Sequence, residues 1–105
     1  MTEVFAERLS TNDESVFVGE IYVESKAEIK AGQIIMTIEG SKGTKDLHAE
    51  VSGIVYLLVN EGQDVPIGSS LYLVFDNISE LETYVLNRED RRDQNYYIDY
   101  NITEK

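Results

Sequence analysis

Residues 34–50 have the sequence IIMTIEGSKGTKDLHAE, which gives the strongest indication of how the chain folds. A nearly continuous apolar run rich in isoleucine precedes a polar turn, and β-branched residues of this kind favour strands. Gly40 and Gly43 bracket Ser41 and Lys42, and glycine supplies the positive φ that a tight hairpin demands. We therefore predict a β-hairpin that leaves Lys42 projecting from a rigid turn into solvent.

The region 1–76 has the pattern of a small all-β domain. It contains all seven glycines and the only proline, and short apolar runs alternate with turn signals at intervals of about 8–12 residues. Strands are predicted at Val4–Leu9, Val16–Val23, Ile34–Glu39, Lys45–Glu50, Ile54–Val59 and Ser70–Phe75. The apolar side chains of the second strand do not keep one alternation, which predicts a bulge near Gly19 or Glu20.

An internal repeat relates two parts of this region at an offset of 36 residues. The aligned pairs are Val23 with Val59, Ile29 with Val65, Gly32 with Gly68, Ile35 with Leu71, and Ile38 with Val74. Neither unit can bury an apolar face alone, so the two should pack together about a pseudo-twofold axis. We expect a flattened β-barrel or sandwich of two pseudo-twofold-related sheets. The same symmetry puts the turn at Ser41 opposite the point, near residue 77, where the chain leaves the β domain.

Residues 77–105 form a second part, without glycine or proline. Asn77 followed by Glu80 resembles a capping box, and apolar residues at 78, 81 and 85 follow helical spacing. This pattern predicts a helix of about three turns. Apolar and polar residues alternate over 96–103, which predicts either a strand or a peptide that orders only against a partner. The expected division is a β domain at 1–76 and a C-terminal helix and tail at 77–105.

The composition excludes several classes of function. Acids outnumber bases 20 to 9, for a net charge of −11, and such a surface repels the phosphates of a nucleic acid. The chain has no cysteine, so disulfides, thiolate catalysis and cysteine-ligated zinc are excluded. No apolar run approaches the roughly 18 residues of a membrane span, and the first ten residues lack the features of a signal peptide. We expect a soluble cytoplasmic protein that binds neither nucleic acid nor membrane.

The segment Ser15–Asn77 resembles the biotinyl/lipoyl attachment domain family, and particularly the lipoyl domains of 2-oxo acid dehydrogenase acyltransferases. Members of the family place the modified lysine in a turn of the type Glu-x-x-Lys-Ala, and Glu39, Lys42 and Gly43 occupy those positions here. Gly53 stands where the family has the glycine that opens the next strand. The resemblance implies the barrel-sandwich hybrid fold of that family.

The resemblance also implies a function. Lys42 would carry a covalent lipoyl group, and Glu39, Gly40, Ser41 and Gly43 would form the hairpin that presents it. The chain would then be a swinging-arm carrier, not an enzyme, that shuttles an acyl or one-carbon intermediate between active sites. Its implied partners are a lipoate ligase or octanoyltransferase, and an enzyme of the 2-oxo acid dehydrogenase or glycine-cleavage type.

Two alternatives stay open. Biotin-accepting members carry methionine on both sides of the lysine, whereas Ser41 and Gly43 stand there in this chain, which favours lipoate over biotin. The same fold also serves as an unmodified structural or adaptor module. His48 is the only histidine, and no partners are spaced to form a metal site with it. The tail lacks the Ala and Pro of an acyltransferase linker, so we expect it to dock on a protein partner or to cap the domain.

Overall fold

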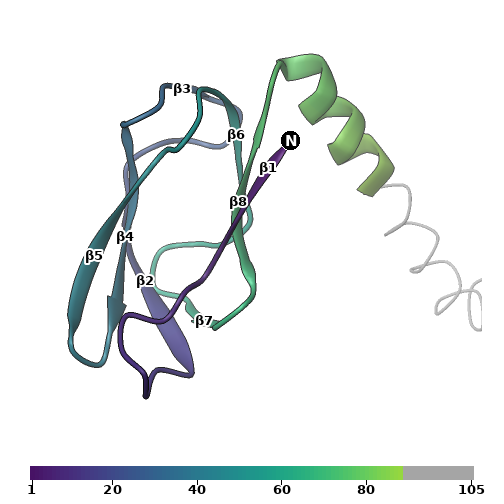
Figure 1. Ribbon diagram of the computed structural model, residues 1–105. Coiled ribbons are helices and arrows are strands. Elements are labelled where there is room, and N and C mark those ends of the chain that lie inside the picture. The colour runs from purple at the N-terminus through teal and green to yellow at the C-terminus, as the bar shows by residue number, and fades with distance from the viewer. Residues whose placement is uncertain (89–105) are drawn as a thin grey trace, which may run out of the picture.

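Eight short strands make two antiparallel sheets of four strands each in the computed structural model (Figure 1). The structure describes residues 1–88; the alternating stretch 96–103 and the rest of the tail lie outside the described residues. The strands are β1 (Thr2–Phe5), β2 (Ser15–Ile21), β3 (Glu28–Ile29), β4 (Ile34–Gly40), β5 (Gly43–His48), β6 (Gly53–Leu57), β7 (Asp64–Pro66) and β8 (Ser70–Phe75). One sheet has the order β1-β8-β6-β3 and the other the order β5-β4-β2-β7.

The two sheets face each other and enclose a single apolar core. Each sheet contains strands from both halves of the repeat, so neither half forms a sheet by itself. The largest fully buried core side chains come from six strands and include Val16, Val18, Ile29, Ile35, Met36, Ile38, Val55, Val65, Leu71 and Tyr72. The expected flattened sandwich is therefore confirmed. Within residues 1–88 the sheets do not close into a barrel, because β1 pairs only with β8 and β5 only with β4.

The pseudo-twofold axis is visible in hydrogen bonds exchanged between the halves. The amide of Leu57 donates to the hydroxyl of Ser25 at 2.9 Å, and the amide of Ile21 donates to the carboxylate of Glu61 at 2.8 Å. The 36-residue offset relates Ile21 to Leu57 and Ser25 to Glu61. Each half of the repeat therefore donates one of these bonds to the other half. The repeat found in the sequence is thus the symmetry of the fold.

Backbone conformation follows the same symmetry. Gly32 and Gly68 have φ values of 92° and 93°, in a region that favours glycine. At the next related pair, Gly62 has a φ of 84°, and its counterpart Lys26 adopts a φ of 77° although it carries a side chain. Lys26 is the only non-glycine residue with positive φ in the described part of the chain.

Most predicted strands are present with boundaries shifted by a few residues, and the bulge is confirmed by a register shift between Val18 and Ile21. Two corrections are needed. The first strand ends at Phe5, not at Leu9, because the chain leaves the sheet after Ala6 and forms a loop before β2. Strands β3 and β7 were not predicted, since two or three residues are too few to show an alternation.

A helix over residues 78–88 follows β8 and packs on the outer face of the first sheet (Figure 1). Its start is capped as predicted, because the amide of Glu80 donates to the side-chain oxygen of Asn77 at 3.0 Å. Leu81 is fully buried against Leu73 and Phe75, and Tyr84 lies 5.4 Å from Phe75 between ring centroids. No helix in the described part of the chain is long and apolar enough to span a bilayer.

Candidate functional site

The hairpin between β4 and β5 carries the candidate lysine at its tip. Pairing along the two strands ends at Gly40 opposite Gly43, which leaves Ser41 and Lys42 as a two-residue turn. Gly43 has a φ of 148°, which favours glycine, and a Cβ built there would meet no atom within 4 Å. The Lys42 side chain is exposed. Lys42 therefore stands in open space at the apex of the turn.

The tip lies far from the N-terminus and from the start of the helix. In Figure 1 the turn between β4 and β5 is at one end of the sandwich, whereas the N-terminus and the start of the helix are at the other. This is the arrangement that the pseudo-twofold axis predicts. A group attached to Lys42 would project away from both.

Sequence reasoning missed the residue that fixes this turn, which is Asp13. Its side chain is only 4% exposed, and it lies in the loop between β1 and β2. One carboxylate oxygen, Oδ1, accepts hydrogen bonds from the hydroxyl of Ser41 at 2.7 Å and from the amide of Ser41 at 3.0 Å. The other, Oδ2, accepts from the amides of Ser10 at 3.0 Å and Leu9 at 3.2 Å. Asp13 thus joins its own loop to the residue that precedes Lys42.

The same bonds determine the charge state of Asp13. Those from the Ser41 hydroxyl and then the Ser41 amide lower the pKa of Asp13 below its ordinary value of 3.8, and the weaker bonds from Leu9 and Ser10 act in the same direction. Desolvation opposes them, but it does not reverse the shift. Asp13 is therefore an ionised acceptor at neutral pH, which strengthens its bonds to the turn.

Gly40 has a different role from the one that the sequence suggests. It was expected, like Gly43, to supply a turn conformation, but positive φ is found at Gly43 and not at Gly40. A Cβ at Gly40 would instead come within 2.6 Å of the Asp13 carboxylate and 3.1 Å of the Leu9 side chain. Glycine is needed here because the Asp13 loop packs directly against the backbone.

The remaining candidate residues lie on the two strands just below the tip. Glu39 is exposed and pairs with Thr44, one residue pair below the turn. Lys45 is also exposed, but it lies within β5, opposite the buried Ile38, and not at the apex. Within residues 1–88, no group of three His, Asp or Glu side chains could hold a metal ion. Of the two lysines, only Lys42 presents its amine at the apex of the turn.

Comparison with known proteins agrees with this geometry. Residues 6–74 match the model of the Biotin_lipoyl family, described as "Biotin-requiring enzyme". The matched region begins in the loop that contains Asp13 and ends within β8, so it leaves out the helix. No curated protein matches the chain in sequence. Domains of this family are carriers of covalently attached lipoate or biotin, not catalysts. A match over more than half of the sequence, two sheets with the expected symmetry and an exposed lysine on a tight hairpin together show that the chain belongs to the biotinyl/lipoyl attachment domain family.

Proposed function

We propose that Lys42 is lipoylated and that the protein is a swinging-arm carrier of an acyl or one-carbon intermediate. The observation that supports this most strongly is the exposed amine at the apex of a two-residue turn, opposite the N-terminus and the helix. Attachment would convert the ammonium into a neutral amide, and the surroundings of Gly43 leave room for the arm. When bound, lipoate supplies a disulfide that this cysteine-free chain lacks.

The contribution of the protein itself is to hold the root of the arm. The Ser41 amide and hydroxyl are both bound to Asp13, so the residue next to Lys42 has little freedom to move. A fixed root and a flexible arm keep the carried group at a high effective concentration near each enzyme that docks on the domain. Such a carrier lowers no chemical barrier of its own.

Lipoate is favoured over biotin by the two residues that flank the lysine. Biotin-accepting relatives have methionine at both positions, and this chain has Ser41 and Gly43. The Ser41 hydroxyl donates to Asp13 at 2.7 Å, so this small side chain is directed towards the Asp13 loop and not towards Lys42. An enzyme that recognises two methionine side chains would find neither here.

The partners follow from this proposal. A lipoate ligase or octanoyltransferase would modify Lys42, and an enzyme of the 2-oxo acid dehydrogenase or glycine-cleavage type would use the loaded carrier. The net charge of −11 would steer the carrier towards basic surfaces on these enzymes. All of these partners fit a cytoplasmic protein.

Intact-mass spectrometry tests the proposal. The full chain is incubated with ATP, lipoate and a lipoate ligase, and in parallel with ATP, biotin and a biotin ligase. One lipoyl increment is expected, abolished in Lys42→Arg and retained in Lys45→Arg, which removes another exposed lysine three residues away. A biotin increment alone would assign the chain to the biotin carriers. No increment with either ligase would favour an unmodified adaptor.

A further inference from the structure

A groove of about 370 Å³ opens on the side of the sandwich between the edge strands β1 and β5. Its walls include Glu3–Phe5 of β1 and Lys45–His48 of β5. Consecutive side chains of a strand point to opposite faces of the sheet. Because consecutive residues of both strands line the groove, the groove runs along the strand edges and not over one face of a sheet. In the described chain these edges have no further strand beside them, and their outward backbone groups are free to bind an added strand.

A nearly buried tyrosine forms the floor of this groove. Tyr72 is 1% exposed and packs in the core between the sheets. The Tyr72 hydroxyl forms no hydrogen bond with residues 1–88. Within these residues, every fully enclosed side-chain oxygen or nitrogen has a hydrogen-bond partner, so this hydroxyl is not fully enclosed. Tyr72 is also one of the residues that line the groove, so its unpaired hydroxyl lies at the bottom of the groove with almost no exposed surface. Burial and the negative charge of Glu50 both raise the pKa of Tyr72, so the group is a neutral hydroxyl.

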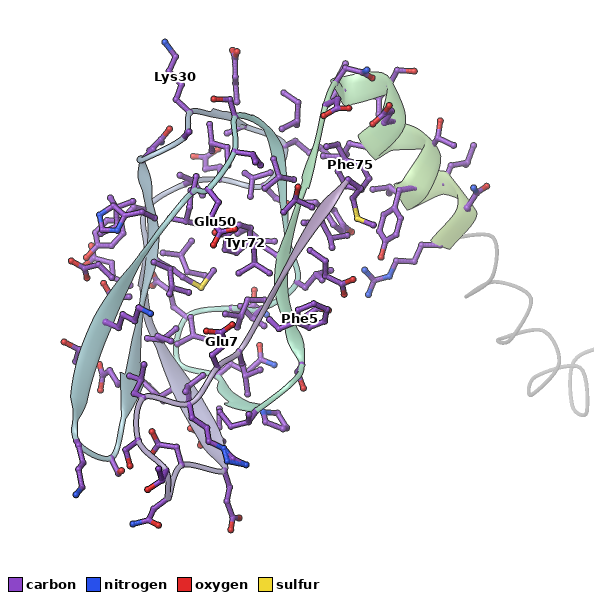
Figure 2. The ribbon with its side chains drawn as sticks, viewed as in Figure 1. Phe5, Glu7, Lys30, Glu50, Tyr72 and Phe75 are labelled. Atoms are coloured by element: carbon purple, nitrogen blue, oxygen red, sulfur yellow. The ribbon has the colours of Figure 1, made fainter. Side chains whose placement is uncertain are left out.

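Carboxylates surround that hydroxyl. Figure 2 shows Glu50 beside Tyr72 in the opening between β5 and β1, with Glu7 further along the same opening. Glu3 and Asp46 also line the groove, and Lys45 is the only basic side chain among the lining residues. The Glu3 carboxylate already accepts a hydrogen bond from the Ser70 hydroxyl, so one of its oxygens is less available to a ligand. Glu50 is thus the charge that a ligand would meet beside Tyr72, and Glu7 is the charge further along the groove (Figure 2).

We propose that this groove binds an extended segment of a partner protein and that an arginine of that segment reaches the Tyr72 hydroxyl. The guanidinium has donors for the phenol oxygen and for the carboxylate of Glu50 beside it. The excess of negative charge disfavours phosphate or a carboxylate ligand. A volume of this size accommodates one long side chain with part of its backbone, and the free edges of β1 and β5 would bind that backbone.

The groove has a useful position relative to Lys42. Strand β5 starts at Gly43, directly after Lys42, and its residues Lys45–His48 form one wall of the groove. A partner bound there would hold the domain by its side and leave the turn free to project. The binding inferred here does not depend on whether Lys42 is modified.

The test uses the full, unmodified chain labelled with 15N and a synthetic pentapeptide blocked at both ends. The peptide has a central arginine flanked by valine and threonine, and the control peptide has citrulline in its place, which is neutral and of the same shape. The arginine peptide should shift the amide signals of β1, β5 and Tyr72, and the citrulline peptide should bind about tenfold more weakly. Equal binding of the two peptides, shifts confined to other surfaces, or no binding at millimolar peptide would overturn the proposal.

Three variants locate the site. Glu50→Gln and Tyr72→Phe should each weaken binding of the arginine peptide, Glu50→Gln by about tenfold. Glu28→Gln makes the same charge change on the edge strand β3, outside the groove, and should leave affinity unchanged. Equal losses in Glu50→Gln and Glu28→Gln would mean that only the overall charge attracts the peptide, which contradicts a defined site. The dispersion of each variant's spectrum checks that it remains folded.

Discussion

Asp13 and Ser41 are 28 residues apart in the chain, and two hydrogen bonds join them, from the Ser41 hydroxyl at 2.7 Å and the Ser41 amide at 3.0 Å to the same carboxylate oxygen. Through this contact the loop before β2 holds the turn that presents Lys42. Because Asp13 is nearly inaccessible, water competes poorly for these bonds. Three predictions concern this contact, and a fourth concerns the packing of the helix.

Replacing Asp13 with alanine should release the turn. The amides of Ser10 and Ser41 would lose their acceptor, so their hydrogen exchange should become faster while the exchange of core strand β4 changes little. Ser41→Ala removes only the hydroxyl donor and should have a smaller effect at the amide of residue 41. Exchange measured by NMR separates the two variants. Unchanged protection of Ser41 in Asp13→Ala would show that the contact does not hold the turn.

The lowered pKa of Asp13 gives a prediction about pH. A carboxyl whose pKa is lower in the folded than in the unfolded state contributes stability above its unfolded pKa, and this is lost as pH falls through the folded pKa. The ordinary value is 3.8, so the contribution should be complete at pH 7 and decline below about pH 5.

Urea unfolding of the wild type and Asp13→Asn from pH 7 to pH 2.5 measures that contribution, since the other carboxylates are common to both proteins. The wild type should be more stable at pH 7, and the difference in unfolding free energy should shrink as the solution becomes acidic. A difference that stays constant over this range would show that the charge of Asp13 is not what stabilises the fold.

Gly40 and Asp13 should be coupled. In Gly40→Ala the new Cβ would come within 2.6 Å of the Asp13 carboxylate, and overpacking of this kind costs about 1–3 kcal/mol. In an Asp13→Ala background the contact with the carboxylate is gone and only the contact with Leu9 at 3.1 Å remains, so the same substitution should cost less. Gly43→Ala is the matched control: its Cβ meets no atom, and its strained φ should cost the same in both backgrounds. Additive effects of Gly40→Ala and Asp13→Ala in a double-mutant cycle would contradict the explanation.

The helix should contribute to stability through Leu81. This side chain is fully buried against Leu73 and Phe75, so Leu81→Ala should lower the unfolding free energy by about 2–4 kcal/mol. Leu86 lies on the same helix and is 58% exposed, so Leu86→Ala should change it by less than about 0.5 kcal/mol. Chemical denaturation of the two variants makes the comparison. Equal stabilities would mean that the helix does not pack on the sheet in solution.

The structural features that could be predicted from the sequence are of two kinds. Some are repeated along the chain, and the others are determined by residues close together in the sequence. The 36-residue repeat identified the pseudo-twofold sandwich, the pair Gly40 and Gly43 identified the turn, and Asn77 with Glu80 identified the start of the helix. Each of these signals is written in local sequence or in a comparison of the chain with itself.

The features that it missed depend on tertiary contacts. Asp13 is one of 20 acidic residues, and its burial beneath the turn depends on where the loop before β2 packs. Its bonds to the amides of Leu9 and Ser10 are local, and an aspartate in a turn often makes bonds of this kind. Its bonds to Ser41 join distant parts of the chain, and nothing in the local sequence indicates them. For the same reason the role of Gly40 was misassigned, and the groove between β1 and β5 had no counterpart in the sequence.

The proposed function requires that Lys42 carries the arm. Tandem mass spectrometry of the wild-type chain, after incubation with ATP, lipoate and a lipoate ligase, locates the modified lysine from fragment ions. We expect a lipoyl group on Lys42, with Lys26, Lys30 and Lys45 unmodified. A lipoyl group on one of those three lysines, with Lys42 unmodified, would contradict the proposal.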